Sequence, residues 1–144
     1  MTVAELIGVR REVYSVRETD TTHEVARYLR DKQVRSVGVL DGAGALVGVI
    51  SQADMSDKVV AEYRCPAIVP ASVIMTRDLV TVRPDTTLDE CLRFMDQHDI
   101  FHLLVVESEG AYLGMVSVSD VLRVVARDER MRADMLEQMV FPSR

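Results

Sequence analysis

The sequence predicts a mixed α/β (α+β) fold built from two copies of one β-α-β-β-α unit. Three observations lead to this prediction: matching residues recur at a fixed offset, apolar residues alternate between strand-like and helix-like periods, and the composition is typical of a globular protein. The chain has 144 residues, 48% of them hydrophobic, and a formal net charge of −6. This length suits one compact domain, or two half-sized units that share a core.

A single offset of 66 residues, the separation of Asp54 and Asp120, relates the two halves of the chain. It superimposes GVISQAD at Gly48–Asp54 on GMVSVSD at Gly114–Asp120, and no gap is needed from Val16 onward. The same offset pairs Val16 with Val82, Arg17 with Arg83, Thr21 with Thr87, Glu24 with Glu90, Arg27 with Arg93, Val39 with Val105 and Gly44 with Gly110. Because one copy of about sixty residues buries little surface alone, we expect the copies to pack face to face.

Within each copy the apolar pattern predicts the same succession of elements. Thr22 and Thr87 are the expected helix N-caps, and acidic residues follow in the first turn. The elements, first copy before second, are an extended piece (13–16, 79–82), a helix (23–32, 88–98), a strand (36–40, 102–106), a glycine-bearing turn (41–44, 107–110), a strand (45–50, 111–116) and a helix from the repeated phrase onward.

The segment between the copies, YRCPAIVPAS, holds two of the four prolines and is typical of a linker. We therefore divide the chain into a first repeat (1–64), a linker (65–74), a second repeat (75–126) and a C-terminal helical tail (127–144).

The serine and aspartate of the repeated phrase have two interpretations. At a strand-to-helix junction, Ser-x-x-Asp is a capping box, in which Ser51 or Ser117 caps the helix and Asp54 or Asp120 accepts the N-cap N–H. The same groups also suit a nucleotide, because a helix start and a serine hydroxyl attract phosphate, and a carboxylate accepts hydrogen bonds from a ribose diol. The spacing permits both interpretations and requires neither.

Both copies resemble cystathionine-β-synthase (CBS) domains, and the pair resembles a Bateman module, over about Val13 to Val125. The resemblance implies two CBS motifs related by a pseudo-twofold axis, with two clefts that bind adenosine-containing ligands such as AMP, ADP, ATP, S-adenosylmethionine or NADH. It rests on the two G-h-h-S-x-x-D phrases, on the strand ends Val39-Leu40-Asp41 and Val105-Val106-Glu107, and on Ile74-Met75-Thr76 before the second copy.

The resemblance also implies a set of ligand-binding residues. Asp54 and Asp120 would bind ribose hydroxyls, and Ser51 and Ser117 would approach ribose or phosphate. The other members would flank the adenine, add hydroxyl groups, meet the base from the opening strand, or lie before the apolar strand near the phosphates: Val49, Met115, Ser119, Ser15, Thr76, Thr81, Ser36, Arg35 and His102. Clefts can combine residues from both copies, so none is assigned to one cleft.

Two features depart from the family pattern. Several relatives carry a basic residue directly before the motif aspartate, where this chain has Ala53 and Ser119, and a familiar strand proline is replaced by Gly38 and Leu104. Strong phosphate binding then requires a substitute cation, for which the candidates are Arg35, Lys58 and Arg77.

Composition excludes some classes of function and location. The negative charge argues against nucleic acid as the main partner. The two cysteines form no disulfide framework, and neither a signal peptide nor a membrane-spanning run is evident, so we expect a cytoplasmic protein without a membrane partner.

Two further groups of residues could indicate metal binding or catalysis. His98 and His102 are four residues apart, but the predicted helix ends between them near Asp99, so no metal site is expected. Ser117, His102 and Asp120 suggest a hydrolytic triad, but nothing marks a nucleophile elbow or an oxyanion hole. We expect no catalysis and no required cofactor, with an adenosine nucleotide as regulatory ligand.

The tail continues an apolar series past the second copy, through Met131, Met135 and Met139. Part of this series could cover its own module, and a methionine-rich stripe also suits a partner helix. Since Bateman modules commonly pair, we expect a homodimer with the tail at or near the interface. The hypothesis is a regulatory sensor that signals to an unknown effector protein. The alternative is a dimeric interaction scaffold with weak or empty clefts.

Overall fold

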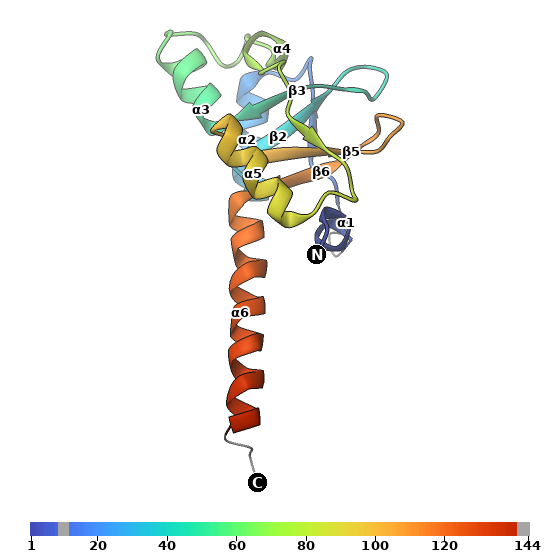
Figure 1. Cartoon of the computed structure of the whole chain (residues 1–144). Coiled ribbons are helices and arrows are strands. Elements are labelled where there is room, and N and C mark those ends of the chain that lie inside the picture. Colours follow the sequence, from blue (N-terminus) through green and yellow to red (C-terminus); the bar gives the residue numbers. More distant parts are fainter. Residues whose placement is uncertain (9–11, 141–144) are drawn as a thin grey trace.

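The computed structural model describes residues 1–8 and 12–140. It contains two three-stranded sheets, with strand orders β1-β2-β3 and β4-β5-β6. The two sheets lie beside each other in the body of the molecule, with β2 in contact with β6, and one long helix leaves the body (Figure 1). Each half has its own buried apolar cluster, one around Val39 and Ile50 and the other around Leu103 and Val116.

The predicted order of elements is confirmed in both halves. The first half comprises β1 (Ser15–Arg17), α2 (Thr22–Lys32), β2 (Ser36–Leu40), β3 (Leu46–Ser51) and α3 (Gln52–Met55), which continues as the π-helical segment η1 (Ser56–Val60). The second half comprises β4 (Thr81–Val82), α5 (Leu88–His98), β5 (His102–Val106), β6 (Tyr112–Ser117) and α6 (Val118–Val140). Two short helices, α1 (Val3–Ile7) and α4 (Ala71–Ile74), precede the two halves.

The strand pairing repeats at the same offset as the sequence. In each sheet the first strand runs parallel to the second, and the second pairs with the third in an antiparallel hairpin. Both hairpins carry a register irregularity at equivalent places, between Val39 and Leu40 and between Val105 and Val106. The repeat in sequence is therefore also a repeat in backbone geometry.

Helices α2 and α5 both begin with a complete capping box. The N-cap of α5 is Thr87, as predicted, and its hydroxyl accepts a hydrogen bond from the Glu90 N–H. The N-cap of α2 is Thr21, so the prediction of Thr22 was wrong by one residue. Thr22 lies inside the helix, fully buried, where its hydroxyl donates to the Pro66 carbonyl at 3.1 Å.

The short helices pack across the boundaries expected from the sequence. Helix α1 packs in the second core, where Val3 is fully buried and its N–H donates to the Thr86 carbonyl at 2.9 Å. Ala71 and Ile74, placed in the linker by composition, are buried in the first core. The linker thus contributes side chains to a core, because removing its apolar side chains from water stabilises the folded protein.

Helix α6 starts against the second core and then continues away from the body (Figure 1). Val121 is fully buried, and Val124 and Val125 pack against the same core. Beyond them the apolar side chains are exposed, up to 78% at Met139. The predicted helical tail therefore continues α6 as far as Val140, and residues 141–144 lie outside the described part of the chain.

Candidate functional site

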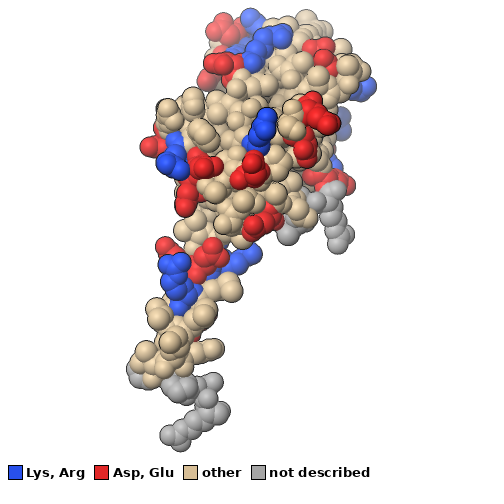
Figure 2. Space-filling view, turned by 45° about the vertical axis from the view of Figure 1, so that its right-hand side comes forward, with Lys and Arg blue, Asp and Glu red and all other residues tan. Residues whose placement is uncertain are grey.

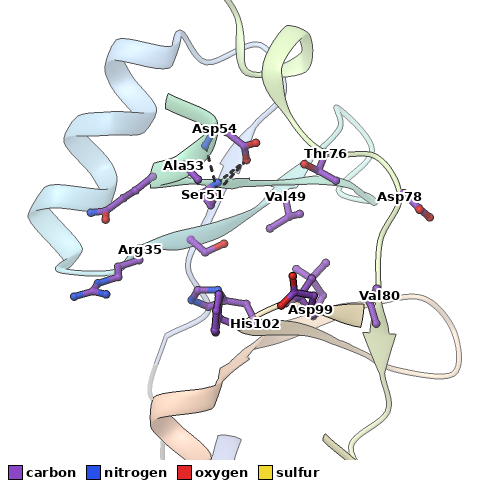
Figure 3. A pocket seen from close by; sticks show the side chains of 15 residues that line it. Arg35, Val49, Ser51, Ala53, Asp54, Thr76, Asp78, Val80, Asp99 and His102 are labelled. Atoms are coloured by element: carbon purple, nitrogen blue, oxygen red, sulfur yellow. Dashed lines mark hydrogen bonds between the residues drawn. The ribbon is translucent and has the colours of Figure 1, made fainter. Parts of the chain in front are cut away.

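A cavity of about 420 Å³ lies between the two halves, next to the first repeated phrase. Its walls come from β2, β3 and α3 of the first half and from β5 and the segments before β4 and β5 of the second half (Figure 3). The lining residues are Arg35, Ser36, Val49, Ser51, Gln52, Ala53, Asp54, Thr76, Asp78, Val80, Asp99, Ile100, Phe101, His102 and Leu104. A volume of this size is within the range of small-molecule sites.

Ser51 and Asp54 form a capping box at the edge of this cavity. The Ser51 N–H donates to Asp54 Oδ2 at 2.8 Å, and the Asp54 N–H donates to Ser51 Oγ at 3.3 Å (Figure 3). The Ser51 hydroxyl also donates to Asp54 Oδ2 at 3.2 Å. The structural interpretation of the phrase therefore holds at this junction, and the binding interpretation depends on the acceptor capacity that remains on the two residues.

Lys58 occupies the second carboxylate oxygen of Asp54. Its Nζ lies 2.9 Å from Asp54 Oδ1 and also donates to the Ile74 carbonyl at 2.9 Å. The Asp54 side chain is only 13% exposed. Because each carboxylate oxygen can accept two hydrogen bonds, Asp54 keeps acceptor capacity for a ligand hydroxyl in spite of these contacts.

The second repeated phrase has the same internal geometry. The Ser117 N–H donates to Asp120 Oδ2 at 3.0 Å, and the Asp120 N–H donates to Ser117 Oγ at 3.1 Å. Arg123 lies 3.7 Å from Asp120 Oδ1, and the aspartate side chain is 24% exposed. Both junctions thus use the serine and the aspartate to close a helix start.

His102 connects the cavity with the second junction. It begins β5, pairs with Ser117 across the hairpin and lines the cavity. Burial lowers the pKa of His102, the Asp120 carboxylate opposes this shift, and the Arg35 guanidinium adds to it. The imidazole therefore favours its neutral form, in which one ring nitrogen donates and the other accepts a hydrogen bond.

Thr76 is held at the cavity by the edge of the first sheet. Its N–H donates to the Val49 carbonyl at 2.9 Å, and the Val49 N–H donates to the Thr76 carbonyl at 3.0 Å. Gly48 makes this approach possible, because an added Cβ would lie 2.7 Å from Cγ of Met75. The segment before β4 thereby becomes part of the cavity wall beside β3.

The three candidate cations have different positions. Arg35 lines the cavity. Lys58 is tied between Asp54 and the Ile74 carbonyl, and the Arg77 guanidinium donates to the Ser72 carbonyl at 3.2 Å without lining the cavity. Of the three, only Arg35 is therefore placed to meet a phosphate directly.

Comparison with known proteins assigns this geometry to a family. The CBS domain family model matches the chain twice, over residues 3–61 and 71–127. The chain belongs to the CBS domain family. Its two repeats form a CBS domain pair, and such a pair is a regulatory module.

Two curated relatives illustrate the sequence similarity. The chain is 30% identical over 115 residues to the uncharacterized protein MK0525 of Methanopyrus kandleri, a match covering 80% of this chain and 59% of that protein. It is 37% identical over 119 residues to the magnesium transporter MgtE of Thermus thermophilus, covering 79% of this chain and 25% of the transporter. The chain thus matches only part of the length of each of these relatives.

Two solved structures share the fold. A protein with CBS domains from Burkholderia ambifaria MC40-6 has a TM-score of 0.82 and 27% identity, covering 89% of this chain and 96% of that one. The CBS domain pair of protein MJ0100, solved in complex with 5′-methylthioadenosine and S-adenosyl-L-methionine, has a TM-score of 0.79 and 22% identity, covering 89% and 98%. The second likeness shows the fold alone.

The structure brings together part of the residue set that the CBS resemblance implied. Arg35, Ser36, Val49, Ser51, Asp54, Thr76 and His102 line the cavity. The other members lie outside its lining: Ser15, Thr81, Met115, Ser117, Ser119 and Asp120. Ser15 and Thr81 belong to β1 and β4, and the remaining residues belong to the end of β6 and the start of α6.

The second cleft that the CBS resemblance implies involves a segment outside the described residues. Thr76 corresponds to Arg10, which lies outside the described residues, as do its neighbours at positions 9 and 11. The role of Ser117, Ser119 and Asp120 as ligand-binding residues stays a prediction.

Sequence reasoning did not propose several residues that line the cavity, namely Gln52, Asp78, Val80, Asp99, Ile100 and Phe101. One signal could have found some of them. The offset that pairs Ser36 with His102 also pairs Arg35 with Phe101, and twofold packing brings both pairs to the space between the repeats. Asp78 and Val80 carry no such signal, because they belong to the irregular segment before β4.

The two alternative chemistries find little geometric support. Helix α5 ends at His98, as predicted, so His98 and His102 do not share a helix. Asp99 follows with a left-handed backbone. Over residues 1–8 and 12–140, no group of three or more His, Cys, Asp or Glu side chains could hold a metal ion. In the triad that the sequence suggested, Ser117 Oγ accepts the Asp120 N–H as a helix cap.

Over residues 1–8 and 12–140, no helix has the length and apolarity needed to span a bilayer.

Proposed function

We propose that this CBS pair is a sensor that binds an adenosine-containing ligand in the cavity between its repeats and signals to a partner protein. The observation that carries the proposal is the double origin of the cavity wall. Ser51 and Asp54 come from the first repeat, and Ile100, Phe101 and His102 come from the second. A ligand there contacts both repeats at once, so its binding free energy depends on how they are arranged.

The lining suits a nucleoside. Val49, Val80, Ile100, Phe101 and Leu104 offer apolar surface for the flat faces of a base. Asp54 retains acceptor capacity for a ribose hydroxyl, and Thr76 adds a hydroxyl from the segment that pairs with β3. The MJ0100 pair, whose structure contains two adenosine compounds, supports this class of ligand.

Signalling follows from population shift. A ligand that binds one arrangement of the two repeats more tightly than another raises the population of the first, by no more than its differential affinity. The segment carrying Thr76 is a suitable reporter, because it pairs with β3 at Val49 and leads directly into the second repeat. A partner protein that contacts the module's surface would read the new arrangement.

The test is titration calorimetry of the chain with AMP, ADP, ATP, NADH and S-adenosylmethionine. We expect at least one of these ligands to bind, and Asp54→Asn to weaken it by about tenfold, because an amide replaces one acceptor oxygen of the ribose contact by a donor. Asparagine keeps one oxygen as an acceptor for the Ser51 N–H, so the helix start is preserved.

Glu24→Gln is the matched control, since Glu24 holds the same capping-box position on α2 and does not line the cavity. Asp120→Asn, measured in parallel, reports whether the second junction contributes to binding. Equal affinities of Asp54→Asn and the unmodified chain for every ligand would remove the proposed site.

A second candidate function, a homodimeric interaction scaffold, is favoured by the exposed face of α6. Met131, Met135 and Met139 follow at intervals of four residues on the helix face that packs Val121 and Val124 against the second core. Their exposed fractions are 58%, 65% and 78%. Figure 2 shows this part of the helix projecting from the body, with mostly uncharged side chains toward its end.

A second copy of the chain is the occupant that this face fits best. Asp128 and Arg132 lie near the same face, one turn apart and opposite in charge, so an antiparallel pair of α6 helices can match them. We expect sedimentation analysis to show a dimer that Met135→Gln with Met139→Gln dissociates. Arg130→Gln with Glu137→Gln, on the opposite face, should leave the dimer intact. A monomer at all concentrations would reject the scaffold.

A further inference from the structure

The cavity has a shortage of positive charge. Among the described residues that line it, Arg35 is the one lysine or arginine side chain. Lys58, which does not line the cavity, contacts Oδ1 of Asp54 and the Ile74 carbonyl, both at 2.9 Å. Because each charge of Lys58 and Asp54 largely offsets the other, the pair adds little attraction for an anion.

Two further carboxylates line the same cavity. Asp78 belongs to the segment before β4, and Asp99 is the C-cap of α5. In Figure 3, Arg35 and Asp78 lie toward opposite ends of the cavity, with Asp99 between them. If the charges of Asp54 and Lys58 offset each other, two carboxylates and one guanidinium remain among the lining side chains, so the lining carries a net negative charge.

Backbone N–H groups at the start of α3 that could otherwise bind a phosphate already have acceptors within the chain. The N–H groups of Ser51 and Asp54 donate within the capping box, and the Gln52 N–H donates to the Arg35 carbonyl at 3.0 Å. The backbone therefore offers no cluster of free donors here to replace the missing cations.

His102 does not supply a positive charge either. Burial lowers its pKa, with Asp120 opposing the shift and Arg35 reinforcing it. At neutral pH the imidazole is then a neutral hydrogen-bonding group on the cavity wall.

From these contacts we infer that the cavity selects adenosine ligands whose 5′ substituent is neutral or cationic, and that Asp78 and Asp99 are the residues that discriminate against phosphates. This inference rests on the proposed function, because it specifies the ligand of the same site. The apolar wall and Asp54 bind the nucleoside, which all adenosine ligands share. The lining charges act on the 5′ substituent, where a phosphate is repelled and a sulfonium or ammonium group is attracted.

Calorimetry with adenosine, S-adenosylmethionine, AMP and ATP tests this inference on the complete chain. S-adenosylmethionine should bind at least as tightly as adenosine. AMP should bind about threefold or more weakly than adenosine and ATP more weakly still, because both add negative charge near the two carboxylates. Raising the salt concentration should narrow these differences, since the two carboxylates are exposed and therefore screened.

Asp78→Asn with Asp99→Asn is the decisive variant. Both substitutions keep the size of the side chain, and asparagine tolerates the left-handed backbone of position 99. We expect AMP and ATP to gain about three- to tenfold in affinity relative to adenosine, whereas adenosine itself changes by less than about twofold. Asp96→Asn with Glu137→Gln removes the same number of charges from α5 and α6, away from the cavity lining, and should leave the ratio unchanged.

The possible failures are distinguishable. If AMP or ATP binds more tightly than adenosine, and Asp54→Asn weakens that binding, the sensor function stands and the charge selection is overturned. The same conclusion follows if the Asp78 and Asp99 variant changes the ratio no more than its control. If none of the four compounds binds, the proposed function fails, and the inference fails with it.

Discussion

Lys58 bridges Asp54 and the carbonyl of Ile74, with both contacts at 2.9 Å. One side chain thus joins the helix start of the first repeated phrase to α4, which precedes the second repeat. Replacing Lys58 by methionine keeps the alkyl chain and removes both polar contacts. We expect the free energy of unfolding, measured by urea denaturation, to fall by about 0.5–1.5 kcal/mol.

Arg30→Met is the control for this measurement. Arg30 pairs with Asp31 on the exposed surface of α2, where an ion pair contributes little. A loss for Lys58→Met no larger than that of Arg30→Met would mean that the bridge does not stabilise the fold.

The two halves meet closely at Gly38 and Tyr112. A Cβ added at Gly38 would lie 2.7 Å from Cζ of the tyrosine ring, so alanine cannot fit unless the ring or a strand shifts. We expect Gly38→Ala to lower the free energy of unfolding by about 1–3 kcal/mol in thermal or urea denaturation. Gly42→Ala, which meets no atom within 4 Å, should change it little. Equal effects of the two variants would show that this contact yields easily.

His102 should make stability depend on pH. Its pKa is lowered in the folded protein by burial, so the unfolded chain binds a proton first as the pH falls. The contribution of His102 to stability is therefore complete above its ordinary pKa of about 6.5 and is lost progressively below it.

Urea denaturation between pH 7.5 and 5, an interval of about one unit on each side of that ordinary pKa, measures this effect. His102→Gln should flatten the decline in unfolding free energy, and His23→Gln, on the exposed surface of α2, should not. A His102→Gln profile parallel to that of the unmodified chain would contradict the predicted titration.

Helix α6 should depend on its serine cap. Ser117 Oγ accepts the Asp120 N–H at 3.1 Å, and Ser117→Ala leaves that N–H without its partner. We expect a loss of about 0.5–2 kcal/mol in the free energy of unfolding by chemical denaturation. Ser119→Ala, two residues later on the exposed surface of the first turn, should be neutral or slightly stabilising, because alanine favours helix. If both variants lose the same free energy, the capping box is not the source.

The repeated phrase shows how a correct sequence observation can carry two meanings. The serine and aspartate are helix caps at both junctions, as the local spacing allowed, and the first pair also lies at a cavity. The capping geometry is predictable because its atoms lie within four residues of each other in the chain. The cavity is not predictable in this way, because the rest of its lining comes from residues 76–104.

By itself, the sequence determined the repeat, the order of elements and the capping of α5, since an offset of 66 residues and local apolar periods are visible without folding the chain. Tertiary structure decided that α1 joins the second core, that α4 joins the first, and that Lys58 is held by Asp54 and Ile74. It also placed Asp78 and Asp99 at the site. Such contacts join residues far apart in the chain, and they depend on how the two repeats pack rather than on any local pattern.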